Sequence, residues 1–268
     1  MQGLKTALVT LVETTGASPR PVGSQLAVCE TGESRGLITG GCAEAALMHD
    51  ALDAIQRGEN RRELYGAGSR FKDIVLPCGS GLTVQFDVTL PDADISAVIA
   101  ARRARQVSML VTGGFRRRYL PACRLVCAGR GPIVAAIMQM ADLLEIETVI
   151  YSPDRSDGNC RPLTSAEDFD AAVLDRFSAL ILVFHDHEAE PAILHKALAA
   201  ESFFIGALGS RKAHAARLDT LAADGVAAVD LARIHGPVGL DISAATPPEI
   251  ALSIVSQVVS KWRKDVAL

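Results

Sequence analysis

The chain has 268 residues, of which 49% are hydrophobic and 22% charged, and its formal net charge is −4. These values are typical of one large or two ordinary globular domains and exclude a disordered chain. The negative charge argues against a nucleic-acid binder that neutralises phosphates, and no apolar run approaches the roughly 18 residues that span a bilayer. We expect no signal peptide, and the six cysteines form no CxxC pair. A reducing, cytoplasmic setting is therefore expected.

The part of the chain up to residue 90 predicts a small domain that mixes strands with one helix. Strands are expected over residues 7–13, 25–30, 35–39 and 82–88, from β-branched content and alternation. Glycines and prolines interrupt regular structure over 14–23. Residues 44–57 have helical periodicity, and Gly58 marks the end of that helix.

Residues 91–119 are interpreted as a connector between two domains. They include an expected helix over 95–105 and a strand over 107–112. The run Arg116-Arg117-Arg118 has two interpretations. It is a phosphate-binding cluster or, more often for so short a basic run, a solvated surface face.

From residue 120 to 268 strands and helices alternate, which predicts a parallel sheet with right-handed crossovers. Strands are expected over 124–128, 148–151, 180–184 and 202–207, and helices over 133–144, 190–199, 212–223 and 248–264. The expected fold class is therefore α/β, with a small mixed N-terminal domain followed by a Rossmann-like C-terminal domain.

Gly129-Arg130-Gly131 lies between a predicted strand and a predicted helix, as in the opening of a Rossmann fingerprint. That fingerprint brings backbone N–H groups and a helix N-terminus to a pyrophosphate. Two positions depart from it: Val134 replaces a small residue, and Ser152 stands where an acid binds ribose, with Asp154 two residues later. The sequence leaves open whether the loop holds a nucleotide, a pterin phosphate or neither, and the departures disfavour redox use of NAD.

Two cysteines lie among glycines in the N-terminal third, Cys42 in Thr39-Gly-Gly-Cys-Ala-Glu44 and Cys78 before Gly79. Glycine lets the backbone approach a ligand closely, and cysteine adds a soft, reactive sulfur. A ligand site is one interpretation of Cys42, and a buried small hydrophobe is the other. The remaining cysteines are interpreted as structural, and they are Cys29, Cys123, Cys127 and Cys160.

Several motifs, in the same order along the chain, resemble the XdhC/CoxI family of accessory proteins of molybdenum hydroxylases such as xanthine dehydrogenase. The motifs lie at residues 13–23, 40–44, 76–79, 119–121, 185–186, 204–211, 235–242 and 246–251. The resemblance covers nearly the whole chain. It implies a protein that binds the molybdenum cofactor, protects it during sulfuration and delivers it to an apo-hydroxylase. It also implies a cysteine desulfurase as a further partner, and a homodimer.

The residue types and the resemblance together select the candidate cofactor-binding residues. They are Arg20, Gly40, Gly41, Cys42, Glu44, Cys78, Gly79, Gly129, Gly131, His185, Asp186, Ser210, Arg211, His235 and Asp241. Cys42 is the candidate contact to molybdenum, because soft sulfur suits that metal. Arg20 is expected either to bind a pterin phosphate or to form a salt bridge. Glu44 is expected either to accept hydrogen bonds from a pterin or to place an acid in the first turn of a helix.

Three functional hypotheses follow. The first is a non-catalytic chaperone that carries molybdopterin or its dinucleotide form, with no nucleic-acid or membrane partner. The second is an NAD(P)-dependent oxidoreductase that uses Gly129 and Gly131. The third is an adaptor that binds only proteins.

Overall fold

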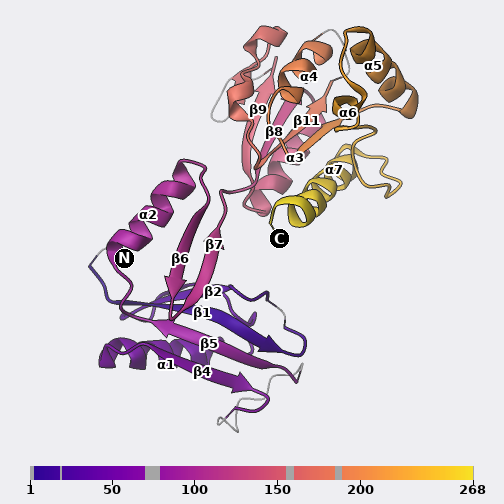
Figure 1. Ribbon diagram of the computed structural model, residues 1–268. Helices are drawn as coiled ribbons and strands as arrows, with labels where there is room; N and C mark the ends of the chain where they lie inside the picture. Colours follow the sequence, from indigo (N-terminus) through magenta and orange to yellow (C-terminus); the bar gives the residue numbers. More distant parts are fainter. Residues whose placement is uncertain (1–2, 19, 70–78, 155–159, 185–188, 268) are drawn as a thin grey trace. The chain divides into compact units, whose positions relative to one another are not determined.

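The computed structural model describes residues 3–18, 20–69, 79–154, 160–184 and 189–267 (Figure 1). The chain divides into two compact units, Met1–Pro121 and Ala122–Leu268. Among the helices of the described ranges, none is both long enough and apolar enough to cross a membrane.

The first unit is built on a five-stranded antiparallel sheet in the order β3-β2-β1-β5-β4. Its strands are β1 (Thr6–Thr15), β2 (Gln25–Cys29), β3 (Ser34–Gly36), β4 (Arg61–Gly66) and β5 (Gly81–Asp87). Helix α1 (Glu44–Arg57) buries Leu47 and Ala51 in one core cluster with the strand residues Val9 and Val84. The helix ends at Gly58, whose φ of +68° suits glycine, as the sequence predicts.

Helix α2 (Asp92–Arg103) and the hairpin of β6 (Ser108–Thr112) and β7 (Phe115–Tyr119) complete the first unit. The segment 91–119, expected to be a connector, therefore folds as part of this unit. The arginine run lies on β7, and strand alternation separates its members. Arg116 and Arg118 are exposed, whereas Arg117 on the opposite face is half-buried.

The second unit is built on a six-stranded parallel sheet in the order β10-β9-β8-β11-β12-β13. Its strands are β8 (Arg124–Gly129), β9 (Glu147–Ser152), β10 (Cys160–Pro162), β11 (Ser178–Val183), β12 (Phe204–Ala207) and β13 (Ile234–His235). In chain order this is the 3-2-1-4-5-6 arrangement of the doubly wound dinucleotide-binding fold. The predicted α/β class with a Rossmann-like second domain is confirmed.

Helices cover both faces of this sheet (Figure 1). They are α3 (Pro132–Leu143), α4 (Glu190–Leu198), α5 (Arg211–Ala223), α6 (Ala228–Leu231) and α7 (Pro247–Lys261), with short turns at Ala166–Asp168, Ala171–Val173 and Trp262–Val266. Along β8, Leu125 and Cys127 belong to the core cluster that contains α3 and α7, and Val126 and Ala128 to the cluster that contains α4. The strand is thus buried on both faces, which explains its continuous apolar run.

Element boundaries differ from the predictions where a specific contact decides them. Strand β3 ends at Gly36 rather than at Thr39, because the N–H groups of Ile38 and Thr39 donate to a carboxylate instead of to a strand. Helix α2 begins at Asp92, directly after Pro91, because acids in the first turn favour a helix start there. The sequence did not predict β4, β7, β10 and β13.

Candidate functional site

The candidate residues of the first unit lie on loops at one end of its sheet. Strands β1, β3 and β4 end in this direction, and β2 and β5 begin there. The loops are staggered, because Gly81 pairs with Thr15 at the end of β1 whereas Gln25 pairs with Thr10, five residues earlier. The β1–β2 loop carries Arg20, the β3–α1 loop carries Gly40-Gly41-Cys42, and the β4–β5 loop carries Gly79. Cys78 lies outside the described residues. The antiparallel topology therefore directs these loops towards the same end of the sheet, although they are far apart in the sequence.

The side chain of Glu44 shapes the β3–α1 loop. Its Oε1 atom accepts from the backbone N–H groups of three loop residues, at 3.1, 2.6 and 3.0 Å from Ile38, Thr39 and Gly40. Its Oε2 atom accepts from the N–H of Gly41 at 2.7 Å and from the Thr39 hydroxyl. The carboxylate is thus turned into its own loop, and its hydrogen bonds are made within the chain rather than towards a pterin.

These hydrogen bonds determine the charge of Glu44. Burial by itself would raise the pKa of the carboxyl group, but the Thr39 hydroxyl and the backbone N–H groups outweigh burial and lower the pKa from 4.5 to about 2. The loop is therefore held by a carboxylate that is ionised at neutral pH.

Cys42 is exposed on this loop, so the interpretation of Cys42 as a buried small hydrophobe is wrong. The two glycines before it have φ values of +83° and +127°, which other residues rarely adopt, and nothing lies within 4 Å of where their Cβ atoms would stand. By contrast, complete burial raises the pKa of the Cys127 thiol to about 12, which keeps it protonated and inert. Within the described residues, no three His, Cys, Asp or Glu side chains are grouped as a metal site.

Arg20 and Gly79 are both exposed. Arg20 is exposed, and its backbone carbonyl accepts from the Ser18 hydroxyl at 2.8 Å. Among the described ion pairs none includes Arg20, so the salt-bridge interpretation finds no partner there. Gly79 has a φ of +66° with open space where a side chain would stand.

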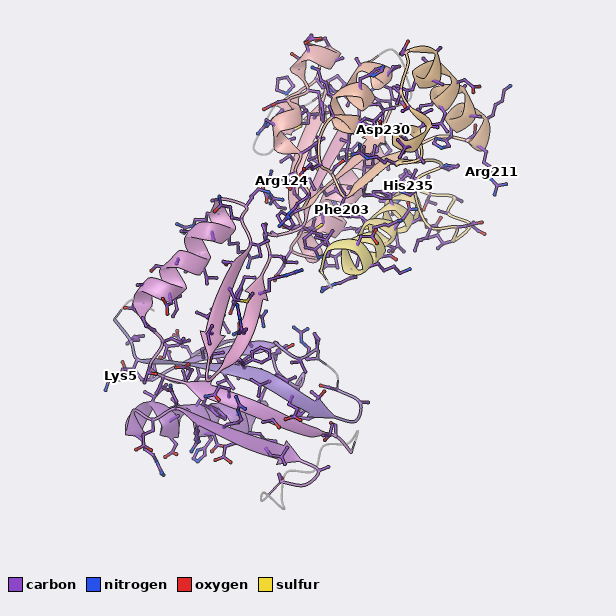
Figure 2. All side chains as sticks on the ribbon, viewed as in Figure 1. Lys5, Arg124, Phe203, Arg211, Asp230 and His235 are labelled. Carbon is purple, nitrogen blue, oxygen red and sulfur yellow. The ribbon has the colours of Figure 1, made fainter. Side chains whose placement is uncertain are left out.

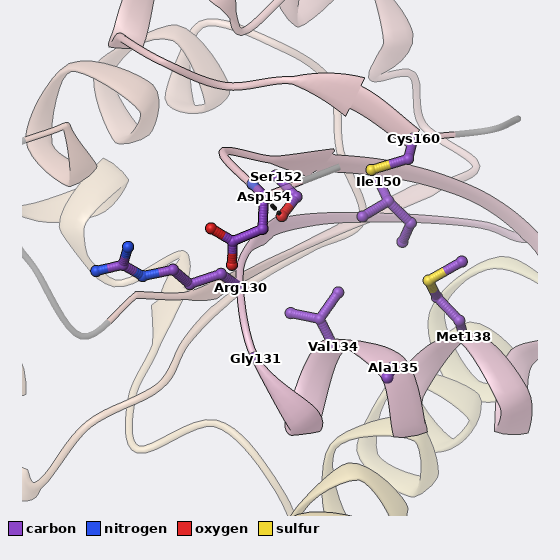
Figure 3. Close-up of a pocket in the computed structure, with 9 residues that line it drawn as sticks. All are labelled: Arg130, Gly131, Val134, Ala135, Met138, Ile150, Ser152, Asp154 and Cys160. Atoms are coloured by element: carbon purple, nitrogen blue, oxygen red, sulfur yellow. Dashed lines mark hydrogen bonds between the residues drawn. The ribbon is translucent and has the colours of Figure 1, made fainter. Parts of the chain in front are cut away.

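The second unit has a cavity of about 230 Å³ at the carboxyl end of its sheet (Figure 3). Its lining residues are Arg130, Gly131, Val134, Ala135, Met138, Ile150, Ser152, Asp154 and Cys160. The glycine loop reaches this position because Gly129 lies against β11, where a Cβ atom would stand 2.0 Å from the carbonyl oxygen of Val183. Gly131, with a φ of +91°, is the N-cap residue of α3.

Both departures from the Rossmann fingerprint line this cavity. Val134 points inward from α3, and Ser152 ends β9. Asp154 lines the cavity two residues later, and its N–H donates to the Ser152 hydroxyl at 3.3 Å. The cavity thus includes an acidic side chain just beyond the end of β9. Met138 and Cys160 also line the cavity, and the sequence gives no signal for them because neither belongs to the fingerprint.

The other candidates of the second unit take different positions. The Ser210 hydroxyl accepts from the Ala213 N–H at 3.1 Å and caps α5, while Arg211 points away from the unit (Figure 2). Asp241 is exposed and accepts from the Ser243 N–H at 3.4 Å. The remaining pair, His185 and Asp186, lies outside the described residues.

His235 lies on the edge strand β13, stacked on the Phe204 ring with 4.8 Å between centroids. Burial lowers the pKa of His235, and the neighbouring Lys261 lowers it further, so the ring is neutral at pH 7. The sequence did not predict the buried ion pair of Glu190 and Arg217, which joins α4 to α5.

Comparison with known proteins gives matches along almost the whole chain. Residues 1–66 match the model described as the XdhC and CoxI family, and residues 125–258 match the XdhC Rossmann domain. The molybdenum cofactor insertion chaperone PaoD of Escherichia coli (strain K12) is 32% identical over 280 residues, covering 97% of this chain and 84% of PaoD.

Two further matches are more distant. The uncharacterized protein YqeB of the same organism is 28% identical over 270 residues, which cover 94% of this chain and 43% of YqeB. A crystal structure described as a xanthine dehydrogenase from Bacillus halodurans superposes with a TM-score of 0.80 at 21% identity, covering 98% of this chain and 93% of that chain. At this identity the likeness shows the fold alone.

Proposed function

The chain belongs to the XdhC and CoxI family, and from that premise we propose that it binds the molybdenum cofactor and delivers it to a molybdenum-containing enzyme. The match to a relative named as a molybdenum cofactor insertion chaperone supports this role. We further propose that the recipient is an apo-hydroxylase of the xanthine dehydrogenase and aldehyde oxidase type. We also propose that the protein is a cytoplasmic homodimer and that it interacts with a cysteine desulfurase.

The observation that carries this proposal is the exposed Cys42 on a glycine loop, at the sheet end that also carries Arg20 and Gly79. The cofactor is the cargo, and its dithiolene supplies sulfur ligands to molybdenum. Cys42 would add one soft sulfur at the metal end. Gly40 and Gly41 would let the backbone lie close to the pterin, since neither carries a side chain.

The second unit favours a second candidate, an NAD(P)-dependent oxidoreductase. Its 3-2-1-4-5-6 strand order and the Gly131 loop at a cavity are features of dinucleotide-binding proteins. The inward-pointing Val134 and Met138 count against it, because they take space beside the loop. A fluorescence titration with NADH and NADPH separates the two candidates.

The proposed function is tested by the molybdenum and pterin content of protein purified anaerobically from a cofactor-producing host. We expect nearly one pterin per chain in the wild type and its loss in Cys42→Ala. Cys123→Ala is the matched control, because Cys123 lies in the second unit, packed against its core.

Each result has one meaning, provided that circular dichroism shows all variants folded. A wild type purified without pterin would contradict the carrier function. Full pterin content in Cys42→Ala would keep the carrier function and remove Cys42 from the binding site.

A further inference from the structure

Arg117 is the inward-facing member of the arginine run on β7. Its guanidinium carbon lies 4.9 Å from the centroid of the Tyr119 ring. Its Nε and Nη1 atoms are buried, and within the described part of the chain neither has a hydrogen-bond partner. Guanidinium nitrogens shielded from water without acceptors are unfavourable, so Nε and Nη1 call for an acceptor that the described residues do not provide.

The side chain of Arg117 faces the β1–β2 loop. A Cβ atom added at Gly23 would stand 3.6 Å from Nη1 of Arg117. The hairpin is fixed at this place by Tyr119, whose hydroxyl donates to Oε1 of Gln25 at 2.6 Å. Gln25 in turn donates to the Thr10 hydroxyl at 3.0 Å. Arg117 is therefore held by the sheet, at the end that carries the candidate loops.

The surroundings of Arg117 contain a second cation. Burial lowers the pKa of Arg117, and the charge of Arg20 lowers it further, whereas Tyr119 opposes this. Among the described residues, no carboxylate is among the groups that shift the pKa of Arg117. Two cations that act on one another without a counter-charge among the described residues favour binding of an anion.

We propose that Arg117 and Arg20 form a binding site for a phosphate dianion. Guanidinium groups bind phosphate oxygens through paired N–H donors, and Nε and Nη1 of Arg117 are buried donors without an acceptor among the described residues. In a carrier of molybdopterin this dianion is the phosphate of the pterin, an identification that rests on the proposed function. The anion site itself does not depend on it.

Calorimetric titration of the full chain with inorganic phosphate, at constant ionic strength, tests the site. We expect Arg117→Met to weaken phosphate binding about tenfold or more, because a charge-assisted hydrogen bond is lost. Arg116→Met is the matched control, since Arg116 lies on the exposed face of the same strand, and its affinity should stay within about twofold of the wild type. Equal affinity in Arg117→Met, or a wild type that does not bind phosphate, would overturn the proposal.

The thermal stability of the phosphate-free protein gives a second readout. Arg117→Met keeps the apolar stem and removes a shielded charge without acceptors, so its Tm should equal or exceed that of the wild type. A purely structural arginine predicts the opposite, a lower Tm in the variant, and that result would contradict a binding role.

Pterin content separates this proposal from the proposed function. If the wild type binds phosphate through Arg117 but carries no pterin, the result would contradict the carrier function and support the anion site. If the wild type carries pterin and Arg117→Met binds phosphate as tightly as the wild type, the result would contradict the anion site and support the carrier function.

Discussion

At the scale of single residues, Glu44 has the position that an anionic ligand takes at other glycine-rich loops. Successive backbone N–H groups of such loops form a concave anion site, and here a side chain of the same chain fills it. The N–H groups of residues 38–41 are consequently used within the loop. A ligand at Cys42 must then be bound through its sulfur, through the faces of the glycines or by residues of other loops.

We expect Glu44→Gln to be less stable than the wild type by about 1–2 kcal/mol at pH 7, a linkage value discounted because the carboxylate is partly solvated. The folded-state pKa is lowered to about 2 from 4.5. The stabilisation is therefore present above pH 4.5 and is lost as the pH falls towards 2. Urea unfolding of both proteins between pH 2.5 and 7 measures this, since only the difference above pH 4.5 should be large.

The exposed Glu59 just after α1 offers the control variant, Glu59→Gln, whose stability should follow the wild type throughout. Equal stabilities of Glu44→Gln and the wild type at pH 7 would show that the loop does not depend on this carboxylate.

At the scale of elements, the turn between β8 and α3 depends on close backbone contact. A Cβ atom at Gly129 would stand 2.0 Å from a backbone oxygen of β11, and the φ of Gly129 is +149°. We expect Gly129→Ala to lower the free energy of unfolding by about 3 kcal/mol or more, because neither strand can move without breaking their pairing.

Gly131→Ala is the matched control, because that position also has a positive φ but nothing within 4 Å of the added carbon. Its cost should be smaller, about 1–3 kcal/mol, the strain of a backbone conformation (φ +91°, ψ −170°) that is nearly restricted to glycine. Urea unfolding curves compare the two variants. Equal costs would mean that β8 and β11 adjust to the added methyl group.

The elements that the sequence predicts are those with a strong period or a marked end. The helix over 44–57 is confirmed with both ends, and the strand at 124–128 to within a residue. Strands β4 and β7 were missed because arginines and a glutamate fill them, and strand preference is weak in such runs. The two and three residues of β13 and β10 are too few to show a period.

The candidate site was only partly predictable for related reasons. A glycine loop before a helix and an exposed cysteine follow from local pattern. The return of the Glu44 carboxylate onto residues 38–41 does not, because it depends on the three-dimensional path of the loop. The inward direction of Arg117 becomes visible only once β7 is known to be a strand, since three identical residues carry no alternation.

At the scale of the whole molecule, each unit has core clusters made of its own residues. One cluster lies within residues 7–88, and two others lie within residues 123–259. We therefore expect a fragment of residues 122–268 to fold by itself, with near-ultraviolet dichroism and one cooperative thermal transition.

A fragment that begins at residue 130 and lacks β8 is the comparison, because β8 is a central strand paired on both sides. It should not fold. A fragment of 122–268 that also lacks cooperative unfolding would show that its core needs the first unit.

The self-contained hydrogen bonding of the Glu44 loop has a consequence for handling a cargo. Because the carboxylate holds the backbone of residues 38–41, the loop is ordered by contacts within the chain. In the proposed carrier, uptake would then carry little entropic penalty for ordering the loop, and release would leave the N–H groups of residues 38–41 paired with the carboxylate. The affinity for the cargo would then depend on direct contacts with the cargo. A recipient enzyme that competes for those contacts would not have to wait for the loop to refold.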